Sequence, residues 1–195
     1  MTFPDRQGER VAAECEHVIV GIDLAYFTAP DDDTAAEAES RLGGPLGWPA
    51  VTAYRRVGLF RKEPVLETLG PAYDGFQTRG YDPVVMLGTL ETLVSHIEYE
   101  ELEKNPRWGR APSDAEPPNG AGVVTLTDTL RDALVAASDD DVHRIAEPWS
   151  RTEELSDAGW EGTTLTDHVR FLMQLRDLAR SAQQRSHHLY CYFES

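Results

Sequence analysis

Cations are scarce in this sequence, and lysine is nearly absent. Two lysines and sixteen arginines stand against thirty-four carboxylates in 195 residues, so the formal net charge is −16 and the sequence pI is about 4.6. Nucleic acids and anionic membranes are bound through clustered cations. The composition therefore predicts no nucleic-acid and no membrane partner, and it favours a basic protein. The alternative, which we favour, is that the acidity is a property of the whole proteome, through a GC-rich genome or adaptation to salt.

Long apolar runs and a cysteine framework are also missing. No stretch of the sequence approaches eighteen apolar residues, so we expect no membrane-spanning helix. Residues 1–13 are polar and lack the apolar segment of a secretory signal, and we expect a flexible N-terminal segment there. Cys15 and Cys191 form neither a CxxC pair nor a metal cluster, which fits a reducing compartment. Together these features predict a cytoplasmic protein.

Short catalytic and metal-binding motifs do not occur in the sequence. It contains no GxSxG, GxGxxG, GxxxxGK[ST] or HExxH pattern. His143 and Glu147 are four residues apart on an expected helix, whereas His187 and His188 are neighbours on an expected strand and point to opposite faces. We therefore predict no metal and no cofactor, and the balance favours a protein without catalytic activity.

Hydrophobic alternation predicts a strand near each end of the chain. In residues 17–27 the main apolar row follows one side and Asp23 lies on the other. Residues 187–193 are apolar on both sides, which is typical of a strand in the interior of a sheet. We predict a single α+β domain over residues 1–195, in which a small mixed or antiparallel sheet includes the N- and C-terminal strands and several helices pack on it.

Capping signals and three- to four-residue periodicity predict the helices between these strands. The expected helices are residues 31–42, residues 82–94 after the start at Asp82-Pro83, residues 99–104, a helix capped near Thr127 or Asp128 that residues 123–126 lead into, residues 138–148 between the Ser138/Asp141 capping box and a stop at Pro148, and residues 165–182. Residues 51–60 and 63–69 are expected to form short elements. Residues 105–122 are expected to form a proline- and glycine-rich loop.

Residues 148–154 are the most distinctive local sequence for binding. Trp149 and Arg151 are followed by two carboxylates, Glu153 and Glu154. Stacking of the guanidinium on the indole, with a carboxylate receiving the cation, would form a rigid recognition corner. The alternative, which we favour, is an internal brace made of the same residues.

Two further sets of residues are binding or proton-transfer candidates. Arg107 and Trp108 bring a cation and an aromatic ring together in the long loop, where the tryptophan either binds a ligand or anchors its own loop. Asp23 and Glu91 are the carboxylates expected nearest to apolar surroundings, where burial raises a pKa. The alternative for both acids, and the one we favour, is a hydrogen-bonded or edge-exposed carboxylate.

The order of the expected elements resembles the YfbM-like family of uncharacterised bacterial proteins. The stretches that carry the resemblance are residues 18–27, 82–94, 124–137, 165–182 and 189–193. The resemblance implies an α+β fold and brings no catalytic signature with it.

Three functions remain open at this point. The first is a non-catalytic protein-binding or regulatory module, similar to an immunity protein, whose acidic surface meets a basic protein. The second is a small-molecule-binding enzyme or sensor with a pocket near the loops that contain tryptophan, arginine and glutamate. The third is a structural homo-oligomer that uses exposed apolar area around the loops.

Overall fold

The structure, a computed structural model, describes most of the chain. The described residues are 23–41, 43–47, 51–58, 61–67, 72–114, 121–156 and 163–194. The segment expected to be flexible at residues 1–13 and the first part of the expected N-terminal strand lie outside these ranges. The described residues form the single α+β domain that the sequence predicts, with the N- and C-terminal strands in one sheet.

The elements follow one another along the chain as a mixture of strands and helices. They are β1 (Asp23–Ala29), α1 (Asp32–Ser40), β2 (Val51–Val57), β3 (Arg61–Glu67), β4 (Gly75–Arg79), α2 (Val85–Ser95), α3 (Tyr99–Leu102), β5 (Ala121–Thr125), α4 (Asp128–Ala136), α5 (Asp139–Ser150), α6 (Glu153–Ser156), α7 (Leu165–Arg185) and β6 (His188–Glu194).

The main sheet has four antiparallel strands in the order β4-β1-β6-β5. β1 and β6, from opposite ends of the chain, are its two inner strands. They pair from Leu24 opposite Phe193 to Ala29 opposite His188. The middle of β6 is buried on both faces, which confirms the prediction of an interior C-terminal strand.

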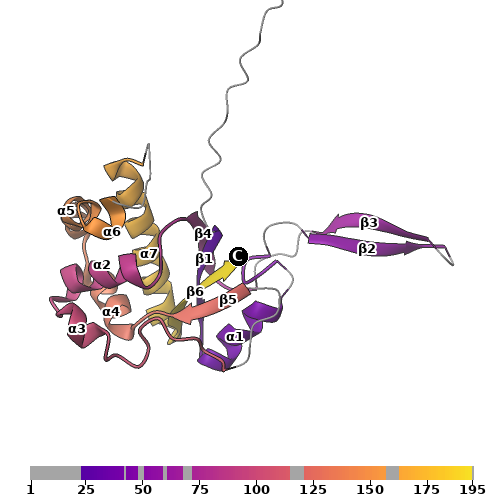
Figure 1. Cartoon of the computed structure of the whole chain (residues 1–195), viewed down its shortest axis with the longest axis horizontal. Coiled ribbons are helices and arrows are strands. Elements are labelled where there is room, and N and C mark those ends of the chain that lie inside the picture. Colours follow the sequence, from indigo (N-terminus) through magenta and orange to yellow (C-terminus); the bar gives the residue numbers. More distant parts are fainter. Residues whose placement is uncertain are drawn as a thin grey trace, which may run out of the picture.

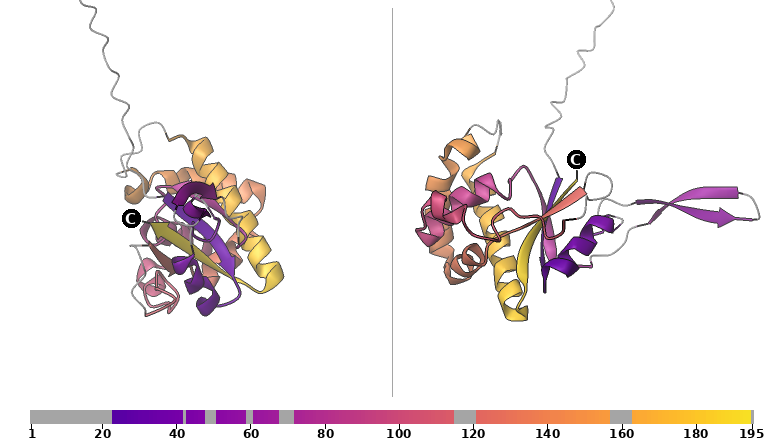
Figure 2. Two further views of the ribbon diagram at one scale, coloured as in Figure 1. Left: turned by 90° about the vertical axis from the view of Figure 1, so that its right-hand side faces the viewer. Right: turned by 60° about the horizontal axis from the view of Figure 1, so that its bottom comes forward.

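Helices cover both faces of this sheet, but unequally. α2, α4, α5 and α7 lie on one face and α1 lies on the other (Figures 1 and 2). Tyr26, Leu189 and Cys191 belong to the core under the large helical layer, whereas Phe27 and Tyr190 belong to a smaller core under α1. The sequence predicted one main apolar row on β1, and the second buried row is a correction that follows from the position of α1. None of the described helices combines the length and the apolar character needed to cross a bilayer.

Residues 121–125 form strand β5, where the sequence predicted the end of a loop and the entry into a helix. The Thr127 hydroxyl accepts a hydrogen bond from the Leu130 amide at 3.0 Å, so the predicted cap of α4 is confirmed. Residues 121–125 before it form an edge strand of the sheet, although the sequence predicted that the loop extends over 105–122 and that residues 123–126 lead into the helix. A five-residue strand that contains glycine is too short to show a clear period.

α5 continues beyond the proline at which its end was expected. The capping box of Ser138 and Asp141 begins the helix as predicted, but the helix includes Pro148 and ends at Ser150. Trp149 holds this last turn, because its ring is fully buried and its Nε1 donates a hydrogen bond to the Met86 carbonyl at 3.0 Å. Tertiary packing therefore overrides the local stop signal.

β2 and β3 form a separate antiparallel hairpin. They pair from Val51 opposite Glu67 to Val57 opposite Arg61, in the region where the sequence predicted two short elements. Figure 1 shows the hairpin extending away from the sheet and helices. Tyr54 on its surface is 68% exposed.

Candidate functional site

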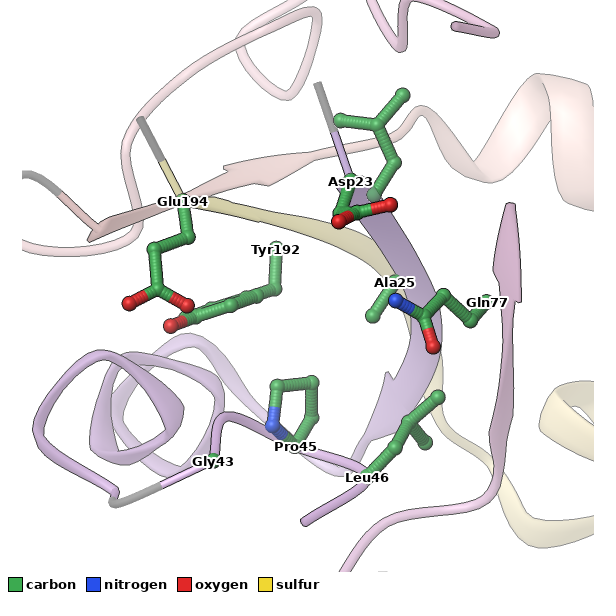
Figure 3. A pocket seen from close by; sticks show the side chains of 9 residues that line it. Asp23, Ala25, Gly43, Pro45, Leu46, Gln77, Tyr192 and Glu194 are labelled. Carbon is green, nitrogen blue, oxygen red and sulfur yellow. The ribbon is translucent and has the colours of Figure 1, made fainter. Parts of the chain in front are cut away.

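A cavity of about 200 Å³ lies on the α1 face of the sheet, at the end where β1 begins and β6 ends. Strands β4, β1 and β6 line one side of it, and the turn after α1 lines the other (Figure 3). The lining residues are Asp23, Leu24, Ala25, Gly43, Pro45, Leu46, Gln77, Tyr192 and Glu194. We call this cavity the carboxylate pocket, because Asp23 and Glu194 contribute two acidic groups to its lining.

The register of the strands explains why these polar groups meet. Gln77 of β4 and Tyr192 of β6 both pair with the same residue of β1 and therefore lie in one row. In the next row Asp23 pairs with Arg79, and the β1–β6 register continued by one residue places Asp23 opposite Glu194. Like charges on neighbouring strands repel each other. This row of the sheet therefore favours a bound cation.

Tyr192 provides an aromatic surface inside the pocket. Figure 3 shows its ring between the Glu194 side chain and Pro45. Gly44, with φ +62°, lets the turn pass so close that a Cβ atom there would lie 2.9 Å from the Tyr192 ring. Burial, together with the nearby charges of Glu194 and Glu39, raises the pKa of Tyr192 to about 12. The hydroxyl is therefore neutral, and its surroundings are negative.

The two carboxylates of the pocket are unequally neutralised. Asp23 receives a hydrogen bond from Arg79 Nε at 2.6 Å, in a pair whose side chains are 41% and 66% exposed. Glu194 has no cation within ion-pair distance among the described residues. An aromatic ring, apolar walls and an unneutralised carboxylate together suit an alkylammonium or guanidinium group. Among the described residues, the pocket contains no nucleophile paired with a base.

A second polar cluster lies at the opposite end of the same sheet face. Arg107 Nη1 donates to Asp32 at 2.8 Å, and the Tyr190 hydroxyl donates to the same carboxylate oxygen at 2.8 Å. The Arg107 guanidinium also lies 5.3 Å from the centre of the Tyr190 ring. Burial raises the pKa of Asp32, but the two hydrogen bonds and the arginine charge outweigh burial and lower it. An open cleft of about 310 Å³ lies beside this cluster.

The charged groups of the second cluster pair mainly with one another, although Arg107 Nη2 is buried and has no hydrogen-bond partner among the described residues. Besides the pair of Asp32 and Arg107, His188 Nδ1 lies 2.7 Å from Asp128, which also receives a hydrogen bond from Arg131 at 2.9 Å. These contacts connect the start of α1, the start of α4, the start of β6 and the loop that contains Arg107. The cluster is therefore built to hold segments together.

We expect Arg107→Ala to lower the free energy of unfolding by about 1 to 2 kcal/mol, because it removes a charged hydrogen bond and a cation–π contact at a half-buried site. Urea denaturation measures the effect. Arg110→Ala is the matched control, since Arg110 is exposed and its side chain makes no ion pair with a described residue. Equal stability of the two variants would contradict a fastening role for Arg107.

The structure separates the residues of the distinctive segment 148–154. Trp149 lies in the core, where its ring stacks on Tyr81 and Phe171. Arg151 is exposed and pairs with Glu147 at 2.6 Å. Glu153 and Glu154 belong to α6, on the surface. The segment is arranged as an internal brace at the tryptophan, with its charged residues facing solvent.

The remaining residues singled out from the sequence lie in four places. Asp23 is in the carboxylate pocket and Arg107 is in the second cluster. Trp108 packs edge-on against Tyr99 of α3, with ring centres 5.7 Å apart, as expected for a loop anchor. Glu91 is only 2% exposed, inside the helical core, whereas the sequence placed it at the edge of its helix.

Sequence patterns missed three residues of the pocket: Gln77, Tyr192 and Glu194. Each lies on a different strand from Asp23, and only the pairing of the strands brings them together. The sequence contains one indication that a pocket lies here. Asp23 is on the side of β1 away from the main apolar row, and a charged residue there indicates that this face of the sheet is partly open to solvent.

Comparison with known proteins identifies no relative of this chain. No family model, no curated protein and no solved structure matches the chain. The resemblance to the YfbM-like family stays a prediction. Among the described residues, no group of three or more histidine, cysteine, aspartate or glutamate side chains is placed to hold a metal ion.

Proposed function

We propose that the protein is a non-catalytic binding module that holds a basic partner through one cationic side chain seated in the carboxylate pocket. The observation that carries this proposal is the combination of Glu194, which no described cation neutralises, with the Tyr192 ring in a cavity of about 200 Å³. A cavity of that size admits the end of an arginine or lysine side chain. It is smaller than the usual site for a drug-sized ligand, which is about 300 Å³ or more.

The charge of the rest of the molecule supports a basic partner. With a formal net charge of −16 the chain attracts cations over a distance and accelerates their association at low salt. Part of this charge lies near Tyr99, whose pKa is raised by burial and by the nearby carboxylates of Glu103, just after α3, and Glu154 of α6. Such carboxylates steer a partner, whereas the pocket provides the specific contact.

The proposal includes the cytoplasm as the location of the protein. Cys191 is a free thiol, and its burial raises its pKa strongly, so the thiolate that would react is suppressed. An inert reduced thiol fits a reducing compartment.

Isothermal titration with n-butylguanidinium and with a short arginine-rich peptide tests the function. Glu194→Gln is expected to weaken the binding of both probes by about tenfold, because it removes the unneutralised carboxylate. The control is Asp140→Asn, which removes an equal charge from an exposed position in the first turn of α5. It is expected to change the affinity by less than about twofold at moderate salt, where distant charges are screened.

Two results would contradict the proposal. One is no heat of binding from either probe at low salt. The other is an equal loss of affinity in Glu194→Gln and Asp140→Asn, which would mean that the general field, and no particular site, attracts the peptide.

The same pocket also fits the second function, a sensor of a small organic cation. A higher affinity for n-butylguanidinium than for the arginine-rich peptide would favour the sensor, because a free small molecule then fills the site better than a side chain on a backbone.

A further inference from the structure

The β2–β3 hairpin has the opposite charge to the rest of the molecule. Its strands, residues 51–57 and 61–67, carry four cations against two carboxylates, in a chain with only eighteen cations altogether. Arg55, Arg56, Arg61 and Lys62 are all exposed. The only ion pair formed by these cations among the described residues joins Arg61 and Glu63 at 3.5 Å, and the Arg61 side chain is 79% exposed. The hairpin is therefore a basic arm on an acidic body.

One face of this arm has an unfavourable charge arrangement of its own. Arg56 lies directly opposite Lys62, and Tyr54 lies opposite Pro64 on the same face. Like charges directly opposite each other weaken a pair of strands. Tyr54 next to them is 68% exposed, so a large aromatic ring accompanies the two cations. This face requires an anionic partner with some apolar surface.

A two-stranded hairpin is also a weak structure by itself. Such a hairpin is marginally stable in water unless a further strand or another surface packs on it. Figure 1 shows that the arm extends away from the body of its own chain. The contact that stabilises it is therefore expected from another molecule.

We infer that this partner is a second copy of the same chain, with the Arg56–Lys62 face of each arm seated on the carboxylate pocket of the other copy. The inference rests on the proposed function, since it names the source of the cation. The complementarity is direct. Two cations side by side on neighbouring strands of the arm meet Glu194, which no described cation neutralises, and Asp23, which also pairs with Arg79, on neighbouring strands of the sheet.

The position of the pocket makes a closed, twofold arrangement possible. The turn containing Pro45 and Leu46, which lines the pocket, lies in the chain just before β2, so the pocket is near the base of the arm. Each strand of the arm has seven residues and spans about 20 Å. Two arms placed side by side in opposite directions therefore bring the end of each one to the base of the other. Such a contact closes with two copies and forms no fibre.

A nucleic-acid partner fits these features less well. A basic hairpin by itself suits the groove of a duplex, as in other β-ribbon readers. Here the arm is attached to a body that makes the whole chain −16, and this body would repel the phosphates flanking the groove.

Sedimentation equilibrium of the full chain at low and raised salt tests the inference. The wild type is expected to be a dimer at low salt that dissociates as salt is raised. The double variant Arg56→Glu/Lys62→Glu is expected to weaken dimerisation by more than about a hundredfold, because the two cations of each arm become carboxylates that face the acidic pocket of the other copy. The exposed-loop variant Arg110→Glu is the control and is expected to remain dimeric.

A mixing experiment guards against misfolding of the arm. The pocket variant Asp23→Lys/Glu194→Lys is also expected to be monomeric alone. Mixed in equal amounts, the arm variant and the pocket variant are expected to form a heterodimer, because each reversed arm then meets a reversed pocket and each normal arm meets a normal pocket. Recovery of the dimer shows that both variants are folded.

Three outcomes would overturn the inference. They are a wild-type chain that stays monomeric at low salt, an arm variant that dimerises as well as the wild type, and binding of duplex DNA that the arm variant loses. A monomer whose pocket still binds n-butylguanidinium would refute the dimer and leave the proposed function standing, whereas a monomer that binds no cation would refute both.

Discussion

Trp149→Ala is expected to lower the free energy of unfolding by about 3 to 5 kcal/mol, because it empties a space that a fully buried tryptophan fills. The ring packs on Tyr81 and Phe171, and the indole Nε1 donates to the Met86 carbonyl at 3.0 Å. A domain of this kind has about 5 to 15 kcal/mol of stability in total, so the variant loses a large share of it. Denaturant unfolding followed by circular dichroism measures the change.

Two companion variants show which part of the local sequence matters. Trp149→Phe keeps an aromatic ring and removes the hydrogen bond, and it is expected to cost less than Trp149→Ala. Arg151→Ala is expected to change stability by no more than about 0.5 kcal/mol, because the pair of Arg151 and Glu147 is exposed. If Arg151→Ala were as harmful as Trp149→Ala, the two side chains would have to act together, as in the stacked recognition corner.

The same variants separate stability from binding. Trp149 lies on the helical side of the sheet and the carboxylate pocket lies on the α1 side. Trp149→Phe is therefore expected to bind n-butylguanidinium with unchanged affinity under conditions where it is folded.

The C-terminal strand and the starts of two helices could be predicted from the sequence. The C-terminal strand was recognised because its residues are apolar on both sides, and β6 is indeed an inner strand. The caps at Thr127 and Ser138 were recognised because a side-chain oxygen before a periodic run satisfies free amides at a helix start. These features depend on short stretches of sequence, where local patterns are sufficient.

Features that depend on distant packing could not be predicted. Pro148 signalled the end of α5 locally, but the burial of Trp149 against Met86 of α2 holds the helix for two further residues. β5 was missed because five residues that include glycine gain their strand structure from pairing with β6, which lies more than sixty residues further along the chain. In both cases the deciding contact comes from another element.

The carboxylate pocket illustrates the same limit for function. Asp23 was a candidate because it carries a charge on a predicted strand, but Gln77, Tyr192 and Glu194 reach the pocket from β4 and β6. Register decides which residues share a row, and a shift by one residue would turn each of them to the other face. At Trp149 and Arg151 the sequence grouped two residues that the structure separates. They are close in sequence, but Trp149 points to the core and Arg151 to solvent.

The unequal covering of the sheet connects fold and function. One nine-residue helix, α1, covers this face, whereas α4 and α7 pack on the other face and α2 and α5 pack against them. The carboxylate pocket lies where the turn after α1 meets the end of the sheet at which Asp23, Tyr192 and Glu194 lie in neighbouring rows. Because the helical face supplies the larger core, the α1 face can leave charged groups partly open without loss of the fold.

Glu91 is a carboxylate that is buried in the helical core. It lies on α2 with 2% of its surface exposed, and its Oε1 accepts a hydrogen bond from the Thr127 hydroxyl at 2.6 Å. Burial raises the pKa of Glu91 from 4.5 to about 6, although the hydrogen bond from Thr127 opposes this effect. The sequence offered two interpretations of this acid, a pKa raised by burial and, as the favoured one, a hydrogen-bonded or edge-exposed carboxylate. Glu91 is both buried and hydrogen-bonded.

This shift predicts a particular dependence of stability on pH. The folded chain binds the Glu91 proton more tightly than the unfolded chain does, so raising the pH from below 4.5 through about 6 favours the unfolded state. The loss amounts to about 2 kcal/mol from this single group and is complete above the folded pKa. Glu91→Gln has no such proton to lose, and its amide oxygen can still accept from Thr127.

We therefore expect the stability of Glu91→Gln relative to wild type to rise by about 2 kcal/mol between pH 4.5 and pH 7. Urea unfolding of both proteins over this pH range gives the difference directly, and effects of the other titrating groups cancel in it. The exposed variant Glu100→Gln serves as the control and should follow the wild-type profile. A constant difference between Glu91→Gln and wild type would mean that Glu91 has the same pKa in both states, and a difference that falls with pH would mean that the core stabilises its charged form.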